Sequence, residues 1–442
     1  MRPISRRSML GGSAALAVAA TLAACSNGSS SGSENGVYLL NFKPEAEEAL
    51  KTIASAYKDK TGVEVKVVTA ASGTYQQTLQ TEVAKSNPPT IFNINGPVGL
   101  VTWKDYALDL SGTEFVKALT DTSMALTDED GVVYGSPLGI EGYGLIYNAA
   151  ILNKYFAMEG AKVKSVDEIK GFAKLKEVVE DMQAKKADLG IEGAFACTSL
   201  TSGEDWRWQT HLANYPVFYE FRDKGVTDAK EVDLTYSDNY KQIFDLYLNN
   251  STVAPSAAAA KTVTDSMADF ALGKCAFVQN GNWAWSQISE VEGNTVAEGD
   301  IHFMPIYIGV SGEEKSGIAL GTENYLAVNS QVSETAQKAS IDFLTWLLTG
   351  EGAKMLVDNS VVSVSPYPAF SELTPADPLG KETAQFLANK ELYPINWVFQ
   401  TFPSQEFKNQ LGSHLAQYAS GKEDWSAVKE YFVTTWKSEK SA

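Results

Sequence analysis

Four short segments of the chain each place an acidic or amide side chain close to a tryptophan or tyrosine. A pyranose ring has an apolar C–H face that packs on an aromatic ring, and its hydroxyl edge hydrogen-bonds to carboxylates and amides. The sequence therefore predicts a binding site for a neutral saccharide. The four segments are SPLGIEGYGLIYN (136–148), SGEDWRW (202–208), QNGNWAW (279–285) and GTENYLAV (321–328).

Glu141, Trp206 and Trp283 are the residues of these segments for which contact with a ligand is favoured. Glu141 stands between Ile140 and Gly142 in an otherwise apolar run, where a solvated surface charge is not expected. A half-buried carboxylate there needs hydrogen-bond partners, and the hydroxyls of a ligand would serve.

Packing in the core is the alternative for every tryptophan. Helical spacing with Phe343 and Leu347 assigns Trp346 to the core. Trp208 is assigned to packing as well, and Trp285 is left open between packing and ligand contact.

Residues that suit catalysis or metal binding are sparse. His211, His302 and His414 are far apart and lack metal-ligand spacing, so neither a metal nor a cofactor is expected. No phosphate-binding loop is present, and the one GxSxG pattern lies in a Ser/Gly-rich stretch at 28–32 that cannot hold a nucleophile. A secreted glycosidase stays open as an alternative, because it needs only two carboxylates about 5 to 9 Å apart. The candidates are Glu141, Glu204, Asp205 and Glu323.

The elements predicted to position these residues alternate between strand and helix periods, which indicates an α/β fold. In a βαβαβ unit, ligands bind at the carboxyl ends of the strands, here the loops after Leu40, Val68 and Phe92. The predicted strands of this unit are 37–41, 63–67 and 90–93, and its helices begin at Pro44 and Tyr75.

A second series of elements follows, and no repeat of solenoid period is visible. The last 70 residues are predicted to be mainly helical. The predicted helices include 166–185, 237–249, one that ends at 267–272, and 335–348, and the predicted strands include 193–197, 275–279 and 323–328.

The first 24 residues have the features of an export signal. Arg2, Arg6 and Arg7 precede an Ala-rich stretch that is shorter than the roughly 20 apolar residues of a membrane-spanning helix. The run Leu22–Cys25 resembles the lipobox of bacterial lipoproteins, so Cys25 is the predicted lipidation site and the anchor to the cell membrane. Residues 25–36 form a predicted flexible tether. Export by the twin-arginine or the ordinary route stays open.

The charge of the chain excludes some partners. Its formal net charge is −18, and removal of the three signal arginines lowers it to about −21. Such a surface repels nucleic acid and anionic lipid, so no nucleic-acid partner is expected. The remaining cysteines, Cys197 and Cys275, suit a disulfide or two buried thiols equally well.

In the order and spacing of its motifs, the chain resembles the extracellular solute-binding proteins of carbohydrate ABC transporters (family 1), the group that includes maltose-binding protein. The resemblance runs from about residue 37 to the C-terminus. Any one of the motifs is weak, whereas four in order are strong. They are NPPTIFN, SPLGIEGYGLIYN, MADFALGKCAFVQNGNWAWSQI, and GTENYLAVNS followed by a helix that ends in TWLLTGEG.

The resemblance implies a two-lobed, periplasmic-binding-protein-like fold, in which each lobe is a sheet flanked by helices and the chain crosses a hinge more than once. By this analogy, residues 37–138 and 306–362 form lobe 1, and residues 139–305 and 363–442 form lobe 2. The expected function is to capture a sugar or oligosaccharide between the lobes and to deliver it to a transporter permease, as a monomer and without catalysis. A binding protein for a non-sugar solute, such as a polyamine or a peptide, is a further alternative.

The resemblance also implies roles for individual residues. Glu141 matches a sugar-binding carboxylate, Trp283 matches a stacking tryptophan, and Glu204–Trp206 matches a loop that supplies a carboxylate and an aromatic ring. The chain departs from the maltose-binding pattern at Asn41–Lys43 and Asn93–Gly96, where that pattern has charged residues, so a glycoside other than maltose is expected. The predicted ligand contacts are Lys43, Asn95, Glu323 and Asn324 in the first lobe, and Glu141, Tyr143, Glu204, Asp205, Trp206 and Trp283 in the second.

Overall fold

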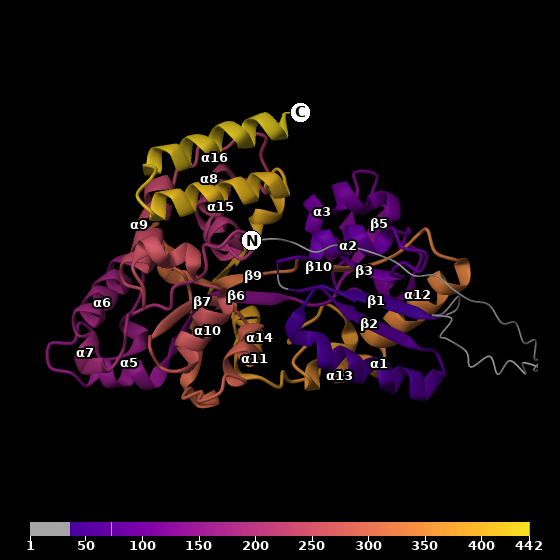
Figure 1. The fold of residues 1–442 in the computed structure, drawn as a ribbon, viewed down its shortest axis with the longest axis horizontal. Coiled ribbons are helices and arrows are strands. Elements are labelled where there is room, and N and C mark those ends of the chain that lie inside the picture. The colour runs from indigo at the N-terminus through magenta and orange to yellow at the C-terminus, as the bar shows by residue number, and fades with distance from the viewer. Residues whose placement is uncertain (1–35, 72, 442) are drawn as a thin grey trace, which may run out of the picture. The chain divides into compact units, whose positions relative to one another are not determined.

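Two β-sheets, each with helices on both faces, make up the part of the chain that the computed structural model describes, residues 36–71 and 73–441 (Figure 1). We call each sheet with its helices a lobe. This architecture confirms the predicted α/β class. The predicted signal segment, tether and Cys25 lie outside the described residues, apart from Gly36.

The first lobe is built on a six-stranded sheet in the order β2-β1-β3-β10-β5-β4. Strands β1, β2 and β3 are parallel, whereas β10 runs antiparallel to β3 and β5. Its strands are β1 (Val37–Asn41), β2 (Val65–Thr69), β3 (Ile91–Asn95), β4 (Leu126–Thr127), β5 (Val133–Pro137) and β10 (Asn324–Val328), and its helices are α1 (Glu47–Thr61), α2 (Tyr75–Val83), α3 (Gly96–Trp103), α4 (Glu114–Lys117), α12 (Glu334–Thr349) and α13 (Gly352–Asp358).

The second lobe has a five-stranded sheet in the order β11-β9-β6-β7, with β8 also paired to β6. Strand β6 runs antiparallel to β7, β8 and β9. Its strands are β6 (Glu141–Asn148), β7 (Phe277–Gly281), β8 (Ile301–Met304), β9 (Ser316–Gly321) and β11 (Tyr393–Asn396), and its helices are α5 (Ala149–Phe156), α6 (Phe172–Ala184), α7 (Lys186–Leu189), α8 (Asn214–Lys224), α9 (Ser237–Asn249), α10 (Val263–Ala271), α11 (Ala284–Ser289), α14 (Pro378–Ala388), α15 (Gln405–Ala419) and α16 (Trp425–Lys440).

Alternation of apolar residues along each strand explains why both faces of each sheet are covered. In β1, Val37 and Leu39 pack against α1, α12 and α13, whereas Tyr38 and Leu40 pack against α2 and α3 on the opposite face. Successive side chains of a strand point to opposite faces, so a strand that is apolar throughout requires a layer of helices on each side. The second sheet follows the same rule, with α10, α11 and α14 on one face and α5, α6, α8, α9, α15 and α16 on the other.

Three segments carry the chain between the two lobes, and the segment after β5 is central to them. The amide of Leu138 donates to the carbonyl of Asn324 (3.2 Å), and the amide of Ile140 donates to the carbonyl of Val364 (2.8 Å). The hydroxyl of Ser365 donates to the carbonyl of Leu138 at 2.8 Å. Neighbouring crossings are therefore joined by backbone bonds, in keeping with the hinge that the family resemblance implies.

Several elements differ from their predicted positions. Residues 306–321 were expected in the first lobe, but β9 lies within them and pairs with β6 of the second sheet. The segment 193–197 was predicted to be a strand, but it makes only isolated bridges, from Phe195 to Ser251 and to Phe277. The remaining lobe boundaries stay a prediction. Cys197 and Cys275 are buried free thiols, which decides the open question about a disulfide.

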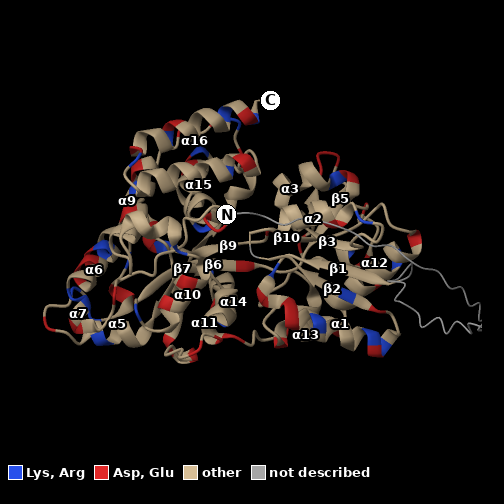
Figure 2. Cartoon of the chain, viewed as in Figure 1, with Lys and Arg blue, Asp and Glu red and all other residues tan. Residues whose placement is uncertain are grey.

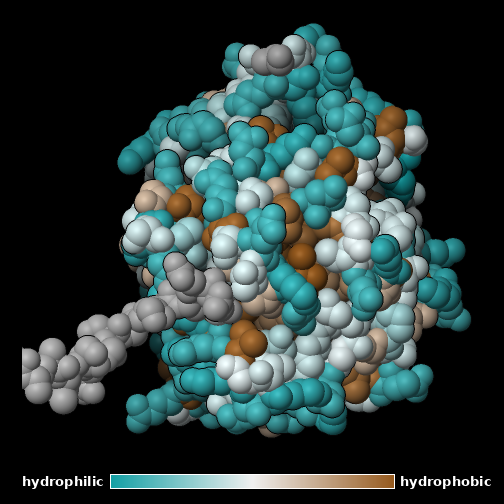
Figure 3. Space-filling model, turned by 90° about the vertical axis from the view of Figure 1, so that its right-hand side faces the viewer, coloured by the Kyte–Doolittle hydropathy of each residue, from teal (hydrophilic) through white to brown (hydrophobic). Residues whose placement is uncertain are grey.

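The charged residues are spread over the helices of both lobes (Figure 2). On the face shown in Figure 3, apolar residues form small patches among hydrophilic ones. None of the helices in the described part of the chain has the length and hydropathy needed to cross a membrane.

The C-terminal helix α16 completes the core of the second lobe through Trp436. This ring is fully buried against Phe402, Phe407 and Phe432. We expect Trp436→Ala to lower the free energy of unfolding by about 3–5 kcal/mol, because it removes a large apolar side chain and leaves a cavity. Denaturant unfolding measures this loss. The neighbouring exposed residue provides the control, since Lys437→Ala is expected to change stability by less than about 0.5 kcal/mol. A loss below about 1 kcal/mol for Trp436→Ala would contradict this packing.

Candidate functional site

Lys43 reaches the site from the loop that follows β1. The side chain of Asn41 holds this loop, because its carbonyl oxygen accepts from the amide of Lys43 at 3.0 Å and its amide group donates to Thr69 at 3.1 Å. The turn fixes the base of the lysine and directs its long side chain toward the other lobe.

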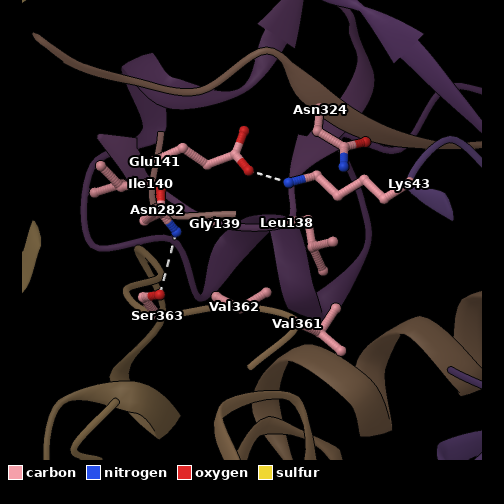
Figure 4. Close-up of a pocket in the computed structure, with 10 residues that line it drawn as sticks. All are labelled: Lys43, Leu138, Gly139, Ile140, Glu141, Asn282, Asn324, Val361, Val362 and Ser363. Atoms are coloured by element: carbon pink, nitrogen blue, oxygen red, sulfur yellow. Dashed lines mark hydrogen bonds and ion pairs between the residues drawn. The ribbon is translucent and has the colours of Figure 1, made fainter. Parts of the chain in front are cut away.

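Glu141 meets Lys43 from the opposite side, at the start of β6. The carboxylate of Glu141 and the ammonium group of Lys43 form an ion pair (Figure 4), although the two residues belong to different lobes. Their side chains are only 16% and 11% exposed. Glu141 is held by its place next to the crossing segment, where Asn282 accepts from the amide of Gly142 at 3.0 Å and donates to Ser363 at 3.2 Å.

A cavity of about 10 Å³ lies beside this ion pair. It has room for about one water molecule and none for a sugar ring. Access for a larger ligand therefore requires the lobes to separate at this point. The residues that line the cavity are Lys43, Leu138, Gly139, Ile140, Glu141, Asn282, Asn324, Val361, Val362 and Ser363.

Aromatic rings of the second lobe lie next to the ion pair. The ammonium group of Lys43 is 5.7 Å from the ring centre of Trp283, and the rings of Trp283 and Trp206 are 6.0 Å apart. Trp283 lies across Gly281 at the end of β7, where a Cβ would be 2.2 Å from the indole ring. The absence of a side chain at Gly281 therefore creates the space that the ring of Trp283 occupies.

His211 and Tyr143 form the layer beneath these tryptophans. Their rings stack with centres 4.0 Å apart, and the hydroxyl of Tyr143 donates to the carbonyl of His211 at 3.0 Å. Burial holds the pKa of His211 well below its usual range, so the ring is neutral at pH 7. Tyr143 is thus buried with its hydroxyl engaged, and its predicted contact with a ligand stays a prediction.

Glu323 lies in the short crossing between β9 and β10, and Asn324 is the first residue of β10. The carboxylate of Glu323 lies 3.8 Å from the ammonium group of Lys408. Burial raises the pKa of Glu323, although Lys408 and a hydrogen bond from the Asn95 side chain act against this shift. The side chain of Asn324 accepts from Asn93 at 2.6 Å. Three predicted first-lobe contacts, Asn95, Glu323 and Asn324, are therefore engaged in hydrogen bonds or an ion pair.

Glu204 and Asp205 have other partners, although they precede Trp206 in the sequence. The carboxylate of Glu204 accepts from the amide of Val263 at the start of α10 (2.8 Å). Asp205 is buried against Gly412 of α15. The structure brings Lys43, Glu141, Trp206 and Trp283 together, and it directs these two carboxylates elsewhere.

Further contacts join the lobes around the site. Gly73 approaches the second lobe so closely that a Cβ there would lie 2.9 Å from the carbonyl oxygen of Gly203. The side chain of Gln400 donates to the carbonyl of Thr322 and lies near Gly96 at the start of α3.

The sequence patterns did not single out three residues that lie near the candidate site, Trp397, Arg207 and Lys408. Trp397 lies across Gly321, and its ring centre is 5.5 Å from that of Tyr143. The signal was present, because Asn396 and Trp397 have the same amide and aromatic pairing as the four segments. Lys408 lies on α15 with no local signal. Arg207 stacks on Trp206 at 3.8 Å, which its sequence position alone does not indicate.

Comparison with known proteins gives a consistent result. Residues 52–384 match the family model of the bacterial extracellular solute-binding proteins. Comparison with curated proteins gives no match. Three solved structures with the same fold are a chitin oligosaccharide binding protein (18% identity, TM-score 0.71, 92% of this chain and 99% of that chain), RafE in complex with raffinose (17%, 0.70, 92% and 99%) and maltose-bound MalE3 of T. maritima (15%, 0.66, 91% and 99%).

The ion pair between Lys43 and Glu141 is expected to favour contact between the lobes. Loss of one partner leaves the other charge buried, at a cost of about 1–3 kcal/mol. We expect Glu141→Gln to move the ligand-free protein toward a larger separation of the lobes. This separation is measured by energy transfer between dyes on engineered cysteines at two exposed positions, Glu48 in the first lobe and Lys176 in the second. Lys338→Gln breaks an exposed pair with Asp342 and serves as the control. An unchanged separation in Glu141→Gln would contradict the role of this pair.

Asp205 gives stability a pH dependence. Burial raises its pKa to about 6, so the folded state holds the proton over a pH range in which the unfolded state has lost it. Stability therefore falls as the pH rises from about 4 to about 6. We expect the free energy of unfolding of Asp205→Asn, relative to that of the native protein, to increase by on the order of 2–3 kcal/mol from pH 4 to pH 7. Denaturant unfolding at both values measures this gain, with Asp188→Asn on the exposed α7 as the control. If the difference in free energy of unfolding between Asp205→Asn and the native protein is the same at both pH values, the pKa of Asp205 is not raised in the folded state.

Proposed function

Because the chain belongs to the bacterial extracellular solute-binding proteins, we propose that it captures a sugar or oligosaccharide between its two lobes and delivers it to the permease of an ABC transporter. The observation that carries this proposal is the position of two tryptophan rings, Trp206 and Trp283, beside the charged groups of Lys43 and Glu141. Ring faces suit the C–H face of a pyranose, and charged groups suit its hydroxyls.

The solved structures with this fold support a saccharide ligand. Their descriptions name a chitin oligosaccharide, raffinose and maltose as what those proteins bind. Family membership also favours capture over hydrolysis, since the family comprises binding proteins and not enzymes. The glycosidase alternative is further weakened by Glu204 and Asp205, whose carboxylates are engaged away from Glu141.

Capture proceeds by exchange of contacts. The lobes separate at the ion pair, the sugar enters, and its hydroxyls then take the place of the contact between Lys43 and Glu141. Closure needs a ligand that binds the closed state better than the open one, so the sugar must touch both lobes. The crossing segments around Leu138 and Ile140 are the proposed hinge.

The proposed location of the protein follows from its family and from its N-terminal segment. Extracellular solute-binding proteins act outside the cytoplasmic membrane. We extend this to a lipid anchor at Cys25, with a monomer tethered near the permease through residues 25–36, which raises the effective concentration of the loaded protein at the transporter.

Trp283 is expected to provide a stacking surface. We expect Trp283→Ala to weaken binding by about 1–3 kcal/mol, which is the cost of losing a comparable stacked ring in other binding sites. Titration calorimetry with a sugar that the native protein binds measures the change in affinity. Trp283→Phe keeps a ring at this position and is expected to retain most of the affinity. Equal affinity in the native protein and in Trp283→Ala would remove this residue from the site.

The ligand itself is found by a thermal-shift screen of mono- and oligosaccharides, because a ligand that binds only the folded state raises its stability by mass action. Polyamines and short peptides belong in the same screen. A shift with these compounds and with no saccharide would replace the sugar by a charged solute, and release of reducing ends from any glycan would favour the glycosidase.

A further inference from the structure

Arg207 is a buried cation beside the proposed sugar site, and it forms no ion pair with a carboxylate of the described residues. It follows Trp206 at the start of a π-helical turn, Arg207–Leu212, and the residue is 1% exposed. Its Nε donates to the side chain of Asn280 at 3.2 Å, and its guanidinium group lies 3.8 Å from the ring centre of Trp206. Its Nη1 has no hydrogen-bond partner among the described residues.

Two acidic groups act on Arg207 through their charge, and neither forms an ion pair with it within the described part of the chain. Glu204 acts on Arg207 through its charge, but its carboxylate accepts from the amide of Val263. Glu45 of the first lobe also acts on Arg207 through its charge, without an ion pair between the two side chains. Glu141 is paired with Lys43.

The two other cations near the site each have a carboxylate partner. Lys43 pairs with Glu141, and Lys408 lies 3.8 Å from Glu323. Burial lowers the pKa of Arg207 to about 9, so the group keeps its positive charge at pH 7. A buried cation with no counter-ion is costly, and proteins usually supply a partner for it.

Other unpartnered polar atoms gather around the same place. Buried polar groups in folded proteins nearly always have a hydrogen-bond partner, so a group of them without one is a place where water or a bound molecule can supply it. His211 contacts both Trp206 and Trp397, and Gln279 donates to the carbonyl of Arg207. The atoms here that have no hydrogen-bond partner within residues 36–71 and 73–441 are Nη1 of Arg207, Nδ1 of His211, Nε1 of Trp397, Oε1 of Gln279 and Oγ1 of Thr322.

We propose that the saccharide carried by this protein is anionic, and that its carboxylate or sulfate group binds Arg207 while its ring packs on Trp206 and Trp283. This rests on the proposed function and refines it, because it names the class of sugar. Arginine presents planar N–H donors that match an oxyanion, and a bond between charged groups is stronger than a bond to a neutral hydroxyl. The neutral saccharide expected from sequence leaves the charge of Arg207 uncompensated.

The test compares sugars that differ at one group. Calorimetry at low salt measures the affinity of a set of oligosaccharides built from hexoses, from the corresponding uronic acids and from the 6-sulfated hexoses. We expect at least one acidic form to bind tenfold or more tightly than its neutral counterpart, and the better of the two acidic forms identifies the anion. In Arg207→Gln the ratio of acidic to neutral affinity is expected to fall to about one, and Arg207→Lys is expected to keep part of it.

Arg222→Gln is the matched control, because it removes the same charge from a more exposed position on α8 of the same lobe. It is expected to leave the ratio unchanged. The melting temperature of ligand-free Arg207→Gln gives a second readout. It is expected to stay level or rise, since the variant removes an uncompensated buried charge.

The outcomes separate this inference from the function on which it rests. Neutral sugars that bind as tightly as acidic ones would overturn the inference and leave sugar capture intact. A preference that persists in Arg207→Gln, together with a lower melting temperature, would give Arg207 a structural role instead. If no saccharide of either class binds, sugar capture fails and the inference fails with it.

Discussion

The ion pair between Lys43 and Glu141 is the interaction on which the arrangement of the site depends. It joins a loop after β1 to the first residue of β6, and these belong to different lobes. Both side chains are largely removed from water, where the attraction between opposite charges is stronger than at an exposed surface. Any ligand that enters must replace this attraction with contacts of its own.

Two glycines allow the aromatic wall beside this pair to form. Trp283 lies across Gly281, and Trp397 lies across Gly321, where a Cβ would be 2.4 Å from the indole ring. Gly321 pairs with Glu141 across the sheet. The rings thus lie directly on the end of the sheet that carries the carboxylate. A side chain at either glycine would overlap the neighbouring ring and displace it.

The charges of the site are distributed unevenly. Glu141 pairs with Lys43 of the other lobe, and Glu323 lies near Lys408 of α15. Glu204 accepts a hydrogen bond from the backbone at the start of α10. Arg207 contacts an amide and a ring and forms no ion pair within the described part of the chain. This distribution of charge is the basis of the proposed preference for a sugar of negative charge. This is the physical link between the packing of the second lobe and the class of sugar proposed here.

The sequence by itself determined the α/β class and the bounds of β1, and it predicted ligand contacts at Glu141, Trp206 and Trp283, which the structure brings close together. Such inferences depend on residue type and on spacing within a few positions, which is information the local sequence contains. Only the tertiary structure decided which group each charge meets. Glu141 and Lys43 are 98 positions apart, and Glu204 reaches an amide 59 positions away. The place of β9 in the second sheet and the unpaired state of Arg207 were decided in the same way, because strand pairing and burial depend on segments that are far apart in the chain.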